Sequence, residues 1–73
     1  ITYVAADSSY LYYIDYDSTR PQGLQHEMWR VARANLTGQR QSLRKGNAMN
    51  GLSVNATHIY FTEGNSLYRM LKP

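Results

Sequence analysis

The sequence predicts an all-β fold made of antiparallel four-stranded units. Short runs rich in Tyr, Ile, Val, Thr, Trp and Phe favour pleated structure over helix. Clusters of Asp, Asn, Ser, Gly and Pro separate these runs and are typical of turns. The strand pattern of the first half of the chain also returns in the second half, at a spacing of roughly forty residues that suits a repeated sheet.

The first half of the chain is expected to form two strands on either side of a long loop. The run Tyr10–Ile14 follows Asp7-Ser8-Ser9, which is a turn-forming cluster. A proline and a glycine then predict an irregular loop over residues 17–26. The next strand is expected at Met28–Ala32, although a helix over Glu27–Leu36, which contains no proline, competes with it.

The second half is expected to form an outer strand followed by a meander. The apolar-poor segment Gln39–Arg44 is the expected outer strand. Three further strands, separated by turns at residues 55–57 and 64–65, are expected at Gly51–Val54, His58–Thr62 and Ser66–Met70. This order of elements predicts antiparallel neighbours throughout.

The length of the chain limits how much core it can form. It has 73 residues and no cysteine, so neither disulfides nor thiolate metal sites can reinforce it. A single core in so short a chain supplies only roughly 3–5 kcal/mol of stability. We therefore expect the chain to be a piece of a larger structure that covers its remaining apolar surface.

The charge pattern does not predict a nucleic-acid or membrane partner. The net charge is +3, and most of the basic residues lie between residues 20 and 45. Arg30 and Arg33 would nevertheless point to opposite faces of an extended strand, so they form no single cationic stripe. The longest apolar run, Tyr10–Ile14, is far too short to span a bilayer.

Motifs for metal, cofactor or catalytic chemistry are not recognisable in the sequence. His26-Glu27 begins like a zinc-binding helix, but Arg30 stands where a second histidine is required. The glycines form no phosphate-binding loop, and no serine lies in a nucleophile motif. Asp15 and Asp17 could share a calcium ion, although loop aspartates more often form turns. We expect no cofactor and no enzymatic activity.

Two segments of the chain repeat one another. Tyr10–Asp15 aligns with His58–Glu63 at an offset of 48, and Met28–Val31 aligns with Leu67–Met70 at an offset of 39. The difference falls in the long loop, where insertions are tolerated. Side chains alternate between the two faces of a strand, so both faces of each repeat would be apolar. Stacked neighbouring sheets are then required to bury them.

Four motifs of the sequence resemble the low-density-lipoprotein-receptor type β-propeller, a six-bladed family. Its Tyr-Trp-Thr-Asp strand is similar to Tyr60-Phe61-Thr62-Glu63 and, more loosely, to Tyr12-Tyr13-Ile14-Asp15. Its closing turn and inner strand are similar to residues 33–38 and 50–55. The matches occur in the order of the family and cover most of residues 10–70. Phe61, Glu63, Thr37 and Asn55 depart from the usual residues of the family.

The resemblance implies a non-enzymatic, extracellular or secretory-pathway segment of a protein-binding receptor or matrix-type module. Residues 1–45 would form a first, partial propeller blade, and residues 46–73 would start the next one. Its partners would be the remaining blades or neighbouring chains and a protein ligand. A fragment of a propeller-type hydrolase or lactonase, or a structural subunit of a large assembly, remains an alternative.

Two further sets of residues are predicted to be functional. Asn35-Leu36-Thr37 and Asn55-Ala56-Thr57 are N-glycosylation sequons at expected turns. Loops at the ends of a propeller usually bind the ligand, so the long loop is the expected contact surface. Its predicted contact residues are Arg20, Gln22, Gln25, His26 and Trp29. Trp29 is also a candidate for the core.

Overall fold

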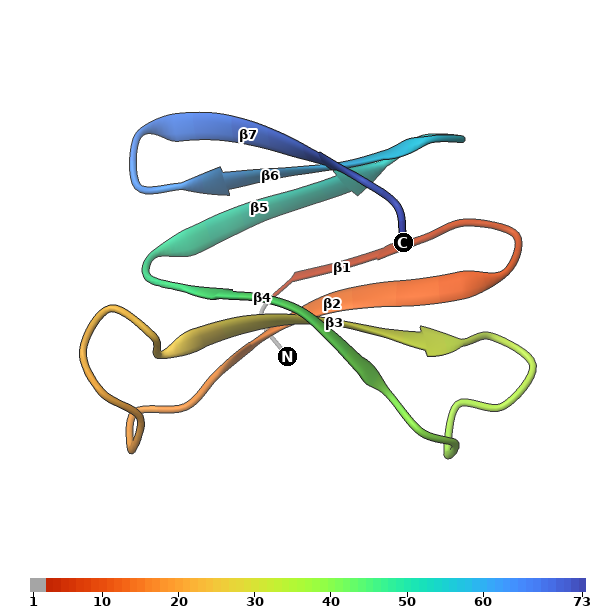
Figure 1. Cartoon of the computed structure of the whole chain (residues 1–73), viewed down its shortest axis with the longest axis horizontal. Helices are drawn as coiled ribbons and strands as arrows, with labels where there is room; N and C mark the ends of the chain where they lie inside the picture. Colours follow the sequence, from red (N-terminus) through yellow and green to blue (C-terminus); the bar gives the residue numbers. More distant parts are fainter. Residues whose placement is uncertain (1–2) are drawn as a thin grey trace.

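The computed structural model describes residues 3–73 and contains two antiparallel β-sheets. The first sheet has the strand order β1-β2-β3-β4, and the second has the order β5-β6-β7. The strands are β1 (Tyr3–Ala6), β2 (Tyr10–Tyr16), β3 (His26–Ala32), β4 (Gln41–Gly46), β5 (Met49–Val54), β6 (His58–Glu63) and β7 (Ser66–Leu71). Within each sheet, every strand pairs with its neighbour in sequence, so both sheets are meanders (Figure 1).

The turns follow from the residues that form them. Asp7 accepts hydrogen bonds from the backbone N–H groups of Ser9 and Tyr10 and so closes the β1–β2 turn. Gly64 joins β6 to β7 with a φ of 62°, a left-handed value that glycine adopts at low cost. The two-residue connection between the sheets contains Ala48, whose φ is also positive at 55°.

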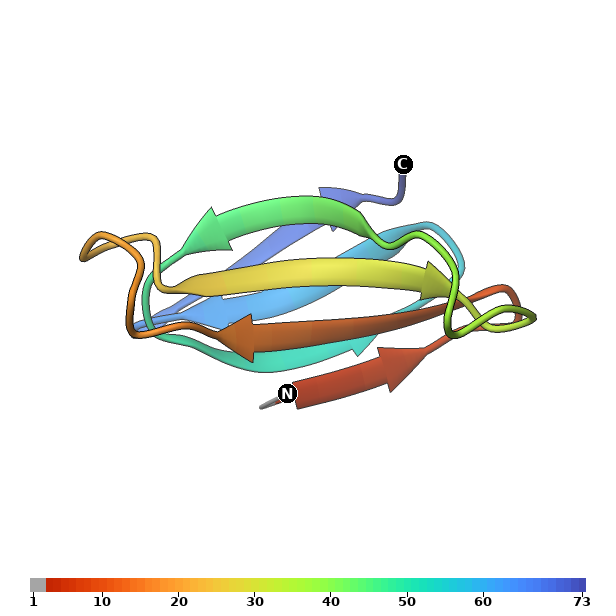
Figure 2. The same ribbon diagram turned by 90° about the horizontal axis from the view of Figure 1, so that it is seen from below.

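The two sheets are stacked on one another; Figure 2, seen from below, shows the first sheet in front of the second. Between them lies one core, to which β2, β3, β5 and β6 all contribute. Its buried members are Tyr12, Ile14, Met28, Met49, Ile59 and Phe61. Each sheet therefore buries one face against the other and turns its second face outward.

The predicted all-β class is confirmed, and most of the expected strands lie within observed ones. The competing helix over Glu27–Leu36 is wrong, because Glu27–Ala32 belongs to β3 and pairs with both β2 and β4. Strand β1 was not expected. Tyr3–Ala6 carries two alanines and no turn residue before it, so the sequence signal is weak, and pairing with the aromatic strand β2 decides its conformation.

The boundary expected between residues 45 and 46 falls at the last residue of β4, three residues before β5 begins. Ile1 and Thr2, which the first predicted unit includes, lie outside the described residues. No helix in residues 3–73 is long and apolar enough to span a bilayer.

Candidate functional site

The long loop between β2 and β3 is tied to the first sheet by a buried ion pair. Glu27 of β3 is 2% exposed, and its Oε1 lies 2.8 Å from Nη2 of Arg20 in the loop. Ser42 of β4 donates a hydrogen bond to the other carboxylate oxygen. Asp17 adds a turn at the start of the loop by accepting the N–H of Thr19 at 2.9 Å. The loop therefore has a defined root.

The five predicted contact residues do not converge on one surface. Gln22 is exposed in the loop, whereas Gln25 donates a hydrogen bond to the backbone oxygen of Ser18. His26 packs on Tyr16 at a ring-centroid distance of 5.0 Å and accepts the N–H of Ala48.

Arg20 serves as the anchor of the loop, and Trp29 lies on the outward face of the first sheet. The structure therefore brings only Arg20, Gln22 and Gln25 together in the loop itself.

The outward face of the first sheet is an aromatic surface covered by an arginine. Tyr13 and Trp29 are cross-strand partners, and the guanidinium of Arg40 lies 3.7 Å from the centre of a Trp29 ring. Arg40 also donates a hydrogen bond to the Tyr13 hydroxyl at 3.2 Å and lies 4.0 Å from a carboxylate oxygen of Asp15. Cation–π contact and hydrogen bonding together explain why Tyr13 is buried on a face with no second sheet against it.

The residues of the two signature-like segments occupy equivalent places in the two sheets. Tyr12, Tyr13 and Asp15 belong to β2, and Tyr60, Phe61, Thr62 and Glu63 belong to β6. Both strands are the second strand of their sheet. Glu63 accepts two hydrogen bonds from Arg44 of the first sheet, at 3.2 and 3.1 Å. Glu63 of the second sheet is therefore held to the first sheet by a guanidinium.

The repeat extends to individual hydrogen bonds. Asn55 accepts the N–H groups of Thr57 and His58 at 2.9 and 2.8 Å, as Asp7 accepts those of Ser9 and Tyr10 at 2.8 and 2.7 Å.

The hydroxyl of Tyr60 bonds the Asn55 side chain, and that of Tyr12 bonds Asp7, both at 3.1 Å. The backbone N–H of Lys72 donates to the carbonyl oxygen of Thr57, and that of Arg33 donates to the carbonyl oxygen of Ser9, both at 3.0 Å. The offset of 48 therefore also relates the β1–β2 turn to the β5–β6 turn.

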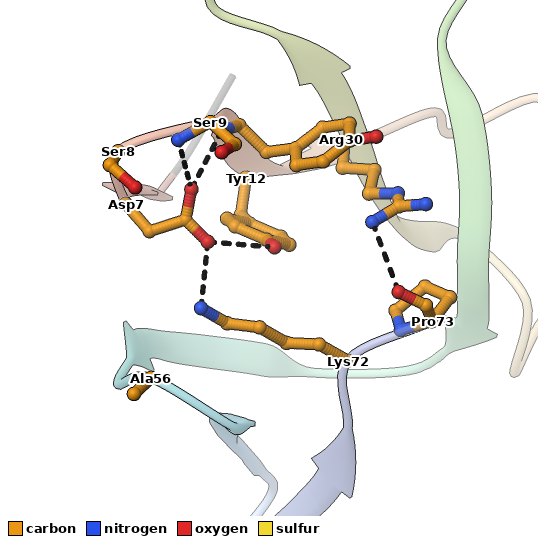
Figure 3. A pocket seen from close by; sticks show the side chains of 9 residues that line it. Asp7, Ser8, Ser9, Tyr12, Arg30, Ala56, Lys72 and Pro73 are labelled. Carbon is orange, nitrogen blue, oxygen red and sulfur yellow. Dashed lines mark hydrogen bonds and ion pairs between the residues drawn. The ribbon is translucent and has the colours of Figure 1, made fainter.

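A polar cleft of about 340 Å³ opens at the β1–β2 turn, where the two sheets meet (Figure 3). Lys72 Nζ donates to Asp7 Oδ2 at 2.7 Å, and the Tyr12 hydroxyl donates to the same oxygen. Arg30 points to the backbone oxygen of Pro73 at 3.4 Å. The cleft thus contains a carboxylate, an ammonium group and a phenol within hydrogen-bond reach.

These contacts shift two pKa values in the cleft. The Lys72 ammonium, assisted by the N–H groups of Tyr10 and Ser9, holds the pKa of Asp7 well below its usual range. Burial, together with the hydrogen bond to the Asp7 carboxylate, raises the pKa of Tyr12. Asp7 is therefore ionised and Tyr12 neutral at physiological pH.

The cleft is better suited to joining the sheets than to binding a ligand, because Asp7 and Lys72 neutralise each other and Arg30 is engaged by the backbone oxygen of Pro73. Sequence reasoning assigned Asp7 to a turn but missed its partnership with Lys72, which lies 65 residues away along the chain. The repeat aligns the turn at Asp7 with the turn at Asn55, but no signal in the sequence shows that Lys72, which follows β7, lies close to Asp7.

The two sequons lie in exposed turns. Asn35 is exposed after β3, and its side chain hydrogen-bonds only within the turn, to Thr37. Asn55 is also exposed, but its amide closes the β5–β6 turn and donates to Tyr60. Asn35 is therefore the more accessible acceptor for a glycan.

Among residues 3–73, no group of three or more His, Asp or Glu side chains is arranged to hold a metal ion. The two histidines hydrogen-bond elsewhere: His26 with Ala48, and His58 with Thr57. Asp17, which with Asp15 is the sequence's candidate for calcium, accepts hydrogen bonds from Thr19 in a local turn.

Comparison of the chain with protein-family models, curated protein sequences and solved structures found no significant match. The propeller resemblance therefore stays a prediction.

Proposed function

We propose that the chain is a segment of an extracellular β-propeller that binds another protein and has no enzymatic activity of its own. The observation that carries this proposal is the relation between the two sheets. They are repeats of one unit, yet they meet through opposite faces: Tyr12 of the first sheet points to the core, and its equivalent Tyr60 points outward. Sheets that stack through alternating faces can continue in one direction, as propeller blades do.

The resemblance to the low-density-lipoprotein-receptor type propeller supports the same proposal. Its four motifs lie at corresponding places of an antiparallel meander, in β2, in β6, in β5 and in the turn after β3. In this arrangement, sheet faces are used for packing and the connecting loops are left for recognition.

The loop at residues 17–25 is the proposed contact with a protein ligand. It protrudes from the sheets at the edge of the molecule, while the buried Arg20–Glu27 pair holds its root (Figure 1). Gln22 and Leu24 are exposed in the loop, so a polar and an apolar side chain are available to a partner. A loop with a fixed root loses less conformational freedom on binding than a free one.

Replacement of Asp17–Gln25 by Asn-Gly tests this assignment. Tyr16 and His26 are paired across the loop, so a two-residue turn can join them directly. Glu27→Gln accompanies the replacement, because it avoids leaving a buried carboxylate without Arg20. Glu27→Gln with the intact loop is the control.

Binding would be measured by displaying each form against a panel of secreted proteins and receptor ectodomains. A partner of the intact chain should bind the shortened form at least about tenfold more weakly, a loss typical of contact residues. Equal binding of both forms would show that the loop is a spacer and would refute its role in recognition.

Extracellular or luminal residence is the second part of the proposal, supported by the accessible sequon at Asn35. When the chain passes through the secretory pathway, its intact mass should include a glycan that Asn35→Gln removes. An unmodified mass would contradict this localisation.

A further inference from the structure

We infer that this chain associates with a second copy of itself, head to tail, through the two sheet faces that point outward. The outward face of the second sheet in one copy would cover the outward face of the first sheet in the next. The inference rests on the stacked-repeat part of the proposed function and not on ligand binding by the loop.

Through the repeat, the two outward faces correspond to the two faces that pack on one another inside the chain. At offsets of 48 and 39, Tyr60, Leu67 and Arg69 on the outward face of the second sheet correspond to Tyr12, Met28 and Arg30. The latter three lie on the inward face of the first sheet, and Tyr12 and Met28 are fully buried there.

The converse correspondence also holds. Leu11, Tyr13 and Trp29 on the outward face of the first sheet correspond to Ile59, Phe61 and Tyr68. Ile59 and Phe61 are buried against the first sheet. The outward face of the second sheet therefore resembles the inward face of the first, and the outward face of the first sheet resembles the inward face of the second. Because the two inward faces pack on one another within the chain, the two outward faces are expected to fit one another in the same way.

Differences in exposure indicate where a second copy would fit. Leu67 is 71% exposed, whereas its equivalent Met28 is fully buried. Around it, Tyr60, Leu67, Tyr68 and Arg69 line a hollow of about 230 Å³. In the interface within the chain, the equivalent surface is covered by Ile59 and Phe61. Leu11 and Tyr13 of a second copy are therefore the side chains expected to fill this hollow.

An arginine provides independent support for this register. Between the sheets, Arg44 lies 5.2 and 5.8 Å from the ring centres of Phe61 and Tyr68 and pairs with Glu63 at 3.1 Å. On the outward face of the first sheet, Arg40 contacts the three corresponding residues: it hydrogen-bonds the Tyr13 hydroxyl at 3.2 Å, lies 3.7 Å from the centre of a Trp29 ring and lies 4.0 Å from a carboxylate oxygen of Asp15.

Arg44 comes from the fourth strand of the first sheet, and the second sheet has only three strands among the described residues. Arg40 of the second copy therefore supplies the cation that the approaching sheet lacks. The aromatic face is already prepared to receive that sheet.

The size of the faces predicts weak association. Six-residue strands in a three-stranded sheet cover roughly 20 by 14 Å, or roughly 300 Å² on each copy. This is well below the area of about 800 Å² per partner in a standard interface, so we expect a dissociation constant on the order of 100 μM. Because the two faces differ, the interface is heterologous and can add further copies.

Sedimentation of the whole chain at concentrations from about 10 to about 500 μM, which bracket that constant, tests the inference. The average mass of the natural sequence should rise with concentration. Two variants each block one face: Val4→Lys on the first sheet, where Val4 is 56% exposed, and Leu67→Lys on the second. Leu36→Lys is the control with equal charge, at a turn residue that is 60% exposed and on neither face.

Each blocked variant alone should remain a monomer, whereas an equal mixture of the two should form a one-to-one dimer. In the mixture, the intact second sheet of Val4→Lys meets the intact first sheet of Leu67→Lys. The control should associate like the natural sequence. Circular dichroism spectra establish that the variants keep the strand content.

Three results would overturn the inference: a natural sequence that is monomeric at every concentration, a blocked variant that still dimerises, or a mixture that does not. A monomeric chain whose loop replacement abolishes ligand binding would overturn self-association alone. Association as expected, with no effect of the loop on binding, would overturn the proposed ligand contact alone.

Discussion

Removal of the Arg20 guanidinium should destabilise the chain more than the loss of a surface ion pair would. Arg20→Ala leaves Glu27, which is 2% exposed, with the Ser42 hydroxyl as its remaining hydrogen-bond donor. Breaking a buried pair costs about 3–5 kcal/mol, whereas breaking an exposed one costs about 1 kcal/mol or less. Because the Arg20 side chain is 25% exposed, the expected cost is near the lower end, about 3 kcal/mol.

Urea unfolding followed by circular dichroism and by the fluorescence of Trp29, the only tryptophan, measures this cost. A loss of about 3 kcal/mol would consume most of the roughly 3–5 kcal/mol that a core of this size supplies. The variant should therefore be largely unfolded at room temperature. Arg69→Ala removes an exposed arginine of β7 and serves as the control, which should change the unfolding free energy by less than about 0.5 kcal/mol.

A double variant distinguishes the effect of leaving the Glu27 charge unpaired from the effect of losing the Arg20 side chain. Adding Glu27→Gln to Arg20→Ala replaces the buried carboxylate by a neutral amide and should recover about 2 kcal/mol. If Arg20→Ala costs no more than the control, the pair behaves as a surface contact. If the double variant is as unstable as Arg20→Ala, the cost comes from loop packing and not from a stranded charge. Either result would refute the reasoning.

Three other perturbations follow from single contacts. Lowering the pH from about 5 to about 2 should reduce the unfolding free energy of the natural sequence more than that of Asp7→Asn. The pKa of Asp7 is lowered in the folded chain, so the stability that this carboxylate contributes is lost as it takes up a proton. Urea titrations at several pH values measure the unfolding free energy. Gly64→Ala should cost about 1 kcal/mol in the same assay, since its φ is +62°, and Gly64→Asn should cost less. Arg40→Gln should shift the emission of Trp29 to longer wavelength by uncovering the indole, whereas Arg33→Gln should not.

Much of the fold could be predicted because the sequence carries two local signals, short strand-forming runs and turn chemistry. The runs Tyr10–Ile14 and His58–Thr62 are nearly continuous in apolar and aromatic residues, which is typical of strands with apolar side chains on both faces. Alternation along the strand places Tyr12 in the core and Tyr13 on the outward face.

The candidate site was less predictable, because its contacts depend on how the long loop folds back and on how the two sheets are stacked. Nothing adjacent to Arg20 indicates that it will pair with Glu27 and not with a ligand. The pairing of Asp7 with Lys72 likewise depends on how the second sheet is stacked on the first. Propensity and spacing describe single strands, whereas the first ion pair depends on the path of a loop and the second on the arrangement of the sheets.

The two outward faces are not equally in need of cover, and this asymmetry bears on how the chain is used. Arg40 covers the rings of Trp29 and Tyr13, so the first sheet already shields its aromatic face from water. The second sheet exposes Leu67 and Leu71, each about 70% accessible, and burial of such side chains contributes roughly 1.5–3 kcal/mol apiece. Covering the second sheet would therefore add stability comparable to the roughly 3–5 kcal/mol expected of the whole core. Of the two outward faces, that of the second sheet therefore has the more to gain from a covering partner.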